Sequence, residues 1–200
     1  MKTGLAVHPE VLAAAAAAAK VLEGAGAHVQ EIPSFLTADL LDGMSRFLEA
    51  RSYNDYMQMP PAKQAKVLPF IVEWCTWRGK NFTGRDVMAA YNSYVALREA
   101  TAKACEPFDF VISPTSPILP YEAELPCPGN DPHNALPHIA FTVPYNMSEQ
   151  PAASLNWTFS NDGLPIGIQI IGKRFDDLGV LRLSLALEQL RPTQRAWPSP

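Results

Sequence analysis

Residues 152–172, AASLNWTFSNDGLPIGIQIIG, decide the fold class of this chain. Residues 152–159 have the pattern of a strand, and residues 164–172 form an apolar run in which Gln169 is the one polar side chain. Between them, the Asn-Asp-Gly at 161–163 has the composition of a hairpin turn. The stretch therefore predicts two paired strands. Gln169 must find hydrogen-bond partners there, and we expect neighbouring backbone groups to supply them.

The segments on either side of this hairpin add helices and further strands. A helix is predicted over residues 176–190, with Asp176 and Asp177 as its cap. The apolar run 109–113 (DFVIS) has no polar alternation and predicts a buried central strand. Residues 141–145 predict a weaker strand. Strands and helices are therefore mixed in this half of the chain.

The first hundred residues are mainly helical in pattern. Thr83 and Asp86 form an acidic variant of the capping box. Short strands are predicted at residues 2–7 and 27–32, around the first helix, and such a strand–helix–strand unit favours parallel pairing through a right-handed crossover. The helices are predicted over residues 9–23, 37–58, 67–78 and 83–105.

The chain divides into three parts that together predict one partial domain, residues 1–200. Residues 1–106 are mainly helical after the initial strand–helix–strand, and residues 166–191 hold a strand and the terminal helix. Most of the 19 prolines lie in the middle part, residues 107–165, where they predict long loops between strands. We expect an α/β fold with a mixed β-sheet flanked by helices.

Composition and charge exclude several classes of protein. Apolar residues make up 48% and charged residues 18%, which is a globular and not a disordered balance. A net charge of −4 does not suit a nucleic-acid partner. No stretch has the length and apolarity of a membrane span, and the N-terminus lacks a secretory signal. Three scattered cysteines form no disulfide framework. We therefore expect a cytoplasmic protein.

Histidines and serines give only weak signals of a site within the chain. His133 and His138, with Asp131 nearby, allow a metal site as one interpretation, but loop histidines of this spacing are more often simply exposed to solvent. The chain contains no Gly-x-Ser-x-Gly nucleophile elbow, so a Ser–His–Asp hydrolase has no support. Neither a metal nor an organic cofactor is expected.

Residues 142–187, TVPYNMSEQPAASLNWTFSNDGLPIGIQIIGKRFDDLGVLRLSLAL, resemble the C-terminal region of the amidase signature family. The upstream segment 108–117 (FDFVISPTSP) is similar to that family's Phe-Asp-hydrophobic-Pro-Thr-x-Pro segment. The resemblance implies the C-terminal portion of the amidase signature fold. The residues that match the family's Pro-x-Asn-x-(Thr or Ser)-Gly-x-Pro-Ala and Gly-Leu-Pro-x-Gly-x-Gln patterns are Pro144, Asn146, Pro151, Ala152 and 163–169 (GLPIGIQ).

Two positions depart from the family pattern. Glu149 stands where the family usually has glycine. Asn156 and Trp157 stand where many members have Pro-Gly. Both departures are expected in loops near the substrate pocket, so the substrate specificity of the family is not carried over to this chain.

The resemblance implies hydrolysis of a carboxamide to an acid plus ammonia or an amine, by a Ser–cisSer–Lys triad. No Gly/Ser-rich run that could supply its serines and oxyanion donors occurs here, so no catalytic residue is expected in this chain. A serine needs an adjacent base to act as a nucleophile. We therefore expect an amidase fragment that is inactive alone. The alternatives are a non-catalytic binding or assembly module, or a partner-dependent transamidase-type subunit.

Three residues are expected to line the pocket for a small-molecule amide. Thr115 and Asn146 each follow an apolar strand, where ligands bind in open α/β sheets. Trp74 is added because the helical insert of the family walls one side of the pocket. Trp77, Tyr91 and Tyr94 at helical spacing are more often core or helix-contact residues. Unpaired sheet edges favour a homodimer, or else loosened loops over residues 121–138.

Overall fold

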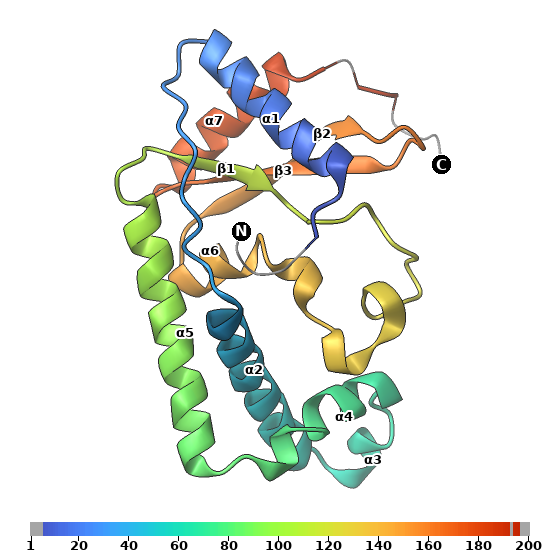
Figure 1. The fold of residues 1–200 in the computed structure, drawn as a ribbon. Helices are drawn as coiled ribbons and strands as arrows, with labels where there is room; N and C mark the ends of the chain where they lie inside the picture. Colours follow the sequence, from blue (N-terminus) through green and yellow to red (C-terminus); the bar gives the residue numbers. More distant parts are fainter. Residues whose placement is uncertain (1–5, 193, 197–200) are drawn as a thin grey trace.

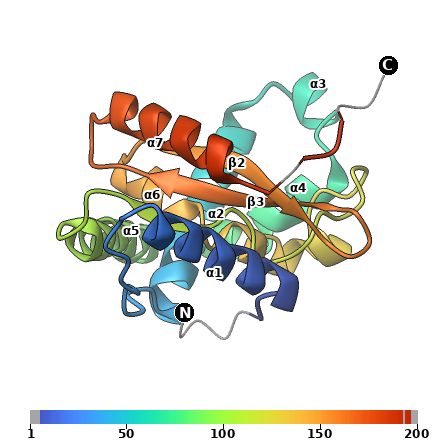
Figure 2. The ribbon, with the colours of Figure 1, turned by 90° about the horizontal axis from the view of Figure 1, so that it is seen from above.

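The computed structural model describes residues 6–192 and 194–196, and Figure 1 shows the arrangement of their helices and strands. A small sheet is covered on one face by α1 and α7, and the long helices α2 and α5 run side by side below it (Figures 1 and 2). The elements are α1 Pro9–Gly24, α2 Ala38–Gln58, α3 Pro61–Gln64, α4 Pro69–Thr76, α5 Gly84–Cys105, β1 Val111–Pro114, α6 Val143–Ser148, β2 Ala152–Phe159, β3 Pro165–Ile171 and α7 Asp177–Leu190.

The sheet of the described residues contains three antiparallel strands in the order β1-β3-β2, so the apolar strand β3 is central. The predicted mixture of parallel and antiparallel strands is therefore not found in this sheet. Across the β2–β3 hairpin, Ala152 pairs with Ile171 and Phe159 with Pro165. Gly163 in the turn has φ +83°, a backbone conformation that glycine adopts without steric cost. The predicted hairpin is therefore confirmed.

Gln169 is the polar side chain inside β3, where it is only 3% exposed. Its Nε2 lies 2.8 Å from Ser113 Oγ, 3.1 Å from the Pro114 carbonyl oxygen and 2.6 Å from the Phe141 carbonyl oxygen. The amide donates to these acceptors and connects β1 and the segment before α6 to the central strand. The prediction that Gln169 satisfies neighbouring backbone groups is confirmed.

The prediction of an N-terminal strand–helix–strand unit is wrong. Residues 27–32 form no strand and are mostly exposed, so no parallel crossover joins them to the sheet of the described residues. His28, Gln30 and Glu31 in this segment leave too little apolar surface to bury it beside another strand. The strand predicted at residues 2–7 falls largely outside the described residues, and its described end is irregular.

Two further strand predictions need correction. Residues 141–145 are not a strand, because α6 begins at Val143. Pro144 lies in the first turn of α6, where its fixed φ suits a helix and its missing N–H costs nothing. The predicted central strand at residues 109–113 is β1, which forms from Val111 and lies at an edge of the three-stranded sheet.

The larger hydrophobic core lies between the sheet and the helices α1 and α7. Ala14 and Ala18 of α1 are 5% and 0% exposed and belong to this core. Their small side chains let the helix approach the sheet closely. Trp157, on β2, is 1% exposed and belongs to the same core as Leu187 of α7. The expectation that Trp157 lies in a loop near a pocket is therefore wrong, since its ring fills the core.

No helix within the described ranges is long and apolar enough to cross a membrane.

Two helices begin at the caps that the sequence predicts. At the start of α5, Thr83 Oγ1 accepts from Asp86 N at 3.2 Å, and the Asp86 carboxylate accepts from Thr83 N at 2.8 Å. This is a capping box. At the start of α7, Asp176 Oδ1 accepts from Gly179 N at 3.0 Å. Both predicted caps are confirmed.

Aromatic side chains join α2 to α5. The ring centroid of Phe47 lies 5.4 Å from that of Tyr94 and 5.7 Å from that of Tyr91. Gly43 of α2 faces Ser93 of α5 so closely that a Cβ at Gly43 would overlap the serine side chain. Tyr91 and Tyr94 are therefore helix-contact residues.

Candidate functional site

The three residues predicted to line a pocket lie in three different places. Trp74, on α4, lines a cavity of about 450 Å³ between α2, α4 and the loop at 132–140, which we call the α2–α4 cavity. Thr115, just after β1, lines a second cavity of about 470 Å³ beside β2, which we call the β2 cavity. Asn146, on α6, lines neither, and its Nδ2 donates to the Thr142 carbonyl oxygen at 3.0 Å. The structure does not bring the three side chains together.

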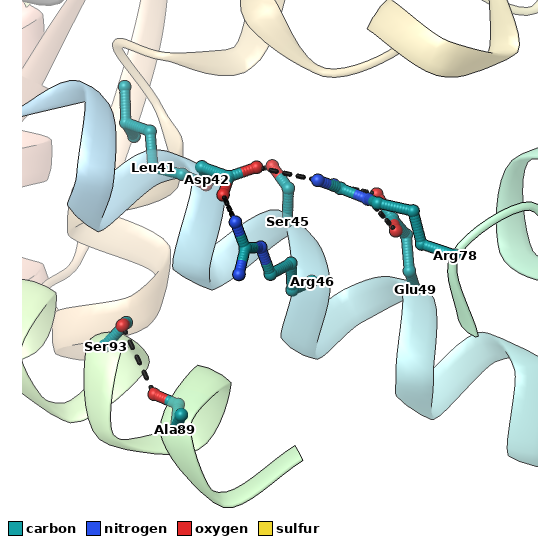
Figure 3. A network of polar contacts seen from close by, with 8 residues as sticks. All are labelled: Leu41, Asp42, Ser45, Arg46, Glu49, Arg78, Ala89 and Ser93. Carbon is teal, nitrogen blue, oxygen red and sulfur yellow. Dashed lines mark hydrogen bonds and ion pairs between the residues drawn. The ribbon is translucent and has the colours of Figure 1, made fainter. Parts of the chain in front are cut away.

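Four charged side chains form one network (Figure 3), and three of them, Asp42, Glu49 and Arg78, line the α2–α4 cavity. Arg78 donates to both carboxylate oxygens of Glu49, from Nε at 2.8 Å and from Nη2 at 2.6 Å. Its Nη1 donates to Asp42 Oδ1 at 2.9 Å. The second oxygen of Asp42 pairs with Arg46 Nη2 at 2.6 Å. Asp42 and Glu49 lie seven residues apart on one face of α2, so a single arginine reaches both.

The network favours the charged forms of Arg78 and Asp42. The Glu49 side chain is 3% exposed, and a carboxylate at that depth needs a charged partner. The hydrogen bonds that Arg78 donates to Glu49 are the largest cause that raises the pKa of Arg78, against burial, which lowers it. Burial alone would raise the pKa of Asp42, but the hydrogen bonds and charges of Arg78 and Arg46 together hold it below its ordinary value. Arg78 and Asp42 are therefore both charged at neutral pH.

Trp77 and His133 form another part of the same cavity wall. The two rings stack with centroids 4.5 Å apart, and the Arg78 guanidinium carbon lies 4.6 Å from the Trp77 ring centroid. His133 Nε2 lies 3.2 Å from Glu73 Oε1. His133 thus connects the 132–134 turn to Glu73 of α4 and to Trp77, the residue that follows α4.

The two histidines considered for a metal site are separated by the fold. His133 lines the α2–α4 cavity, whereas His138 lines the β2 cavity. Among residues 6–192 and 194–196, no three His, Cys, Asp or Glu side chains gather in a way that could hold a metal ion. Burial lowers the pKa of His138, so its imidazole is neutral at pH 7. The structure gives the metal interpretation no support.

Hydroxyl groups dominate one side of the β2 cavity. Thr115 Oγ1 and Ser154 Oγ are 2.8 Å apart, and the Thr115 backbone N–H donates to the Gly167 carbonyl oxygen at 3.0 Å. A Cβ at Gly167 would lie 2.9 Å from Thr115 Oγ1 and 3.2 Å from Ser154 Oγ. Glycine at this position therefore leaves room for the pair of hydroxyls.

The sequence did not reveal the charged network. Arg78 meets Glu49 and Asp42 from 29 and 36 residues away, and no local pattern encodes such a contact. The one available signal was the spacing of Asp42, Ser45 and Glu49, which places three polar side chains on one face of an otherwise amphipathic helix.

Glu149 lies outside both cavities, at the C-cap of α6, with φ +61° and ψ +33°. A non-glycine residue in this left-handed conformation costs about 1 kcal/mol. Its carboxylate pairs with Arg98 at 2.8 Å, but the Glu149 side chain is 58% exposed, so the pair contributes about 0–1 kcal/mol. Glycine adopts this left-handed conformation without strain, which gives a physical reason for the glycine that the family usually has at this position.

We expect Glu149→Gly to leave the free energy of unfolding unchanged or to raise it by up to about 1 kcal/mol, because the relief of backbone strain offsets the lost ion pair. Glu149→Ala loses the ion pair but keeps the strained backbone, so we expect it to be the less stable of the two. Urea denaturation measures both variants. An alanine variant more stable than the glycine variant would contradict this explanation.

The chain matches a known protein family over most of its length. The family model described as Amidase matches residues 2–181. The chain is therefore a member of the amidase family of hydrolases, and both the resemblance and the α/β fold class are confirmed.

Particular relatives can also be named. A glutamyl-tRNA(Gln) amidotransferase subunit of Thermodesulfovibrio yellowstonii is 40% identical over 96 residues, which are 48% of this chain and 19% of that protein. The corresponding subunit of Thermosynechococcus vestitus is 27% identical over 223 residues, covering 98% of this chain and 45% of that protein. The solved structure of 6-aminohexanoate cyclic dimer hydrolase matches with a TM-score of 0.73 and 26% identity, over 94% of this chain and 42% of that one. The chain spans less than half the length of each.

Proposed function

We propose that residues 1–200 form one partial domain that supplies a substrate wall of an amidase, in which a linear carboxamide is hydrolysed to an acid plus ammonia or an amine. The observation that carries this proposal is the α2–α4 cavity, with Trp74 in its wall, in a chain of the amidase family. Its volume of about 450 Å³ suits a small molecule. Thr115 and Asn146 are proposed as further substrate contacts in the complete protein.

The proposal includes no catalytic residue in this chain. Three serines line the two cavities, and each has a partner that is not a base. Ser45 Oγ donates to the Leu41 carbonyl oxygen, Ser116 Oγ accepts from a backbone N–H, and Ser154 Oγ is paired with a threonine hydroxyl. A neutral hydroxyl without a base is a weak nucleophile. We therefore propose that these side chains bind substrate and do not attack it.

An experiment on the isolated chain separates binding from catalysis. 3-Phenylpropionamide is titrated into the chain while intrinsic tryptophan fluorescence is recorded, and ammonia release is measured in parallel. The proposal expects saturable binding that Trp74→Ala weakens at least tenfold, with no ammonia released. Binding that Trp74→Ala leaves unchanged would overturn the assignment of the cavity, and ammonia release would overturn the absence of a catalytic group.

A partner-dependent transamidase-type subunit is the second candidate. It is favoured by the 40% identity, over about half of this chain, to a protein named as one subunit of an amidotransferase. The three cysteines are free and buried, which supports a reducing compartment such as the cytoplasm for either candidate. The two candidates differ in the fate of the amide nitrogen, which is released to water by an amidase and passed to an acceptor by a transamidase.

We expect the isolated chain to form a homodimer. The outer face of α7 exposes Leu178, Leu181 and Leu185, whose exposed fractions are 57%, 63% and 58%. Strands β1 and β2 each have one edge without a partner strand among the described residues. Such surfaces favour self-association. Sedimentation equilibrium should therefore give a dimer that Leu181→Asp shifts towards monomer, whereas a monomer at all concentrations would contradict this expectation.

A further inference from the structure

We infer that the α2–α4 cavity accepts an uncharged apolar or aromatic group of the substrate and excludes both carboxylate and ammonium groups. This inference rests on the proposed function, and it specifies which amides the cavity wall would select. Three observations support it. The charged side chains of the wall are paired with groups of this chain, the pair of Glu49 and Arg78 is largely buried, and aromatic side chains line the cavity beside them.

The wall charges cancel within the network itself. Two carboxylates of the wall, Asp42 and Glu49, pair with two guanidinium groups, Arg78 of the wall and Arg46 outside the cavity lining. Each carboxylate oxygen has an arginine nitrogen within 2.9 Å. An ionic ligand group entering the cavity therefore meets no free counter-ion on this wall and must lose its water without a replacement.

Burial prevents the Glu49–Arg78 pair from opening to serve a ligand. The side chains of Glu49 and Arg78 are 3% and 25% exposed, so separating them would leave a charge in poorly solvated surroundings. His133, which also lines the cavity, is engaged as well, because its Nε2 contacts Glu73 Oε1 at 3.2 Å and its ring stacks on Trp77. The side chains of Glu49 and Arg78 and the imidazole of His133 are therefore all occupied by partners within the chain.

The rest of the wall suits an uncharged group. Trp74 and Trp77 supply aromatic surface, and Leu41 and Met44 of α2 supply aliphatic surface. Burial of apolar area against such side chains favours binding without any charge. An amide substrate with an aromatic or alicyclic substituent therefore fits this cavity, and one with an α-carboxylate or a free ammonium group does not.

The test uses three probes of the same skeleton and different charge, which are 3-phenylpropionamide, 3-phenylpropionate and 3-phenylpropylamine. Their dissociation constants for the isolated chain are measured by tryptophan fluorescence at pH 7 and constant ionic strength. We expect the amide to bind roughly tenfold more tightly than either ion, which corresponds to about 1.4 kcal/mol. Equal or tighter binding of either ion would overturn the inference.

A second test changes the charge of the cavity wall without shortening a side chain of the wall. Asp42→Asn keeps an oxygen acceptor for Arg78 but leaves the network with one excess positive charge. We expect it to tighten the binding of 3-phenylpropionate roughly tenfold relative to the binding of the uncharged amide to the same variant. Asp55→Asn is the matched control, because Asp55 lies on the same helix and loses the same charge but does not line the cavity.

The outcomes distinguish this inference from the proposed function. Tight binding of the propionate to the unaltered chain, lost in Trp74→Ala, overturns the inference and leaves the proposed function standing. Equal effects of Asp42→Asn and Asp55→Asn also overturn the inference. If none of the three probes binds, both the proposed function and the inference fail.

Discussion

Arg78→Met is expected to lower the free energy of unfolding by about 3–5 kcal/mol. The Glu49 carboxylate is 3% exposed, and both of its oxygens accept hydrogen bonds from Arg78. Without the guanidinium, a buried charge is left unpaired, whereas the methionine retains most of the apolar contact of the arginine stem. Urea denaturation followed by circular dichroism measures the loss.

Arg46→Met is the matched control for this prediction. Arg46 belongs to the same network, but its side chain is 52% exposed and its partner Asp42 keeps a second arginine. We expect this variant to lose less than about 1 kcal/mol. The double variant Arg78→Met with Glu49→Leu should recover most of the stability, because it removes the unpaired charge. Equal losses in the two arginine variants would show that the burial of Glu49 does not set the cost.

Gln169→Leu is expected to lower the free energy of unfolding by about 2–4 kcal/mol. Leucine matches the apolar neighbours of Gln169 in β3, so the sequence pattern alone would predict a gain. The structure predicts a loss, because the carbonyl oxygens of Pro114 and Phe141 lose the side-chain donor that they share. Urea denaturation of the isolated chain gives the value.

Two further variants test whether the loss of stability at Gln169 comes from its buried hydrogen bonds. Gln189→Leu, at an exposed position on α7, is the same change without buried partners, and we expect it to alter stability by less than about 0.5 kcal/mol. Gln169→Glu keeps the shape but replaces the donor by an acceptor, so it should be at least as destabilising as leucine. A stable glutamate variant at neutral pH would contradict the hydrogen-bond explanation.

The parts of the fold that could be predicted are those encoded within a few neighbouring residues. The hairpin at 152–172 combines a strand pattern, a turn and an apolar strand in one stretch, and the caps at Thr83 and Asp176 need only three or four residues. The segments at 27–32 and 141–145 have too weak an alternation to decide between strand and other structure. Their state depends on what packs against them, which a local pattern does not contain.

The candidate site was predictable only in part, for the same reason. Trp74 was placed correctly on a helix, but its cavity neighbours Glu49 and Arg78 come from separate elements and meet only in the folded chain. Thr115 and Asn146 were expected in one pocket because each follows an apolar segment. Asn146 instead lies on α6, where its amide is used by the helix backbone.

The central claim is that this chain shapes the place where an amide binds and holds no group that attacks it. Incubation of the isolated chain with a fluorophosphonate probe, followed by intact-mass and peptide mass spectrometry, tests this claim most directly. The account predicts an unchanged mass under conditions that fully label a serine hydrolase run in parallel. A stoichiometric adduct on any serine of the chain would contradict it.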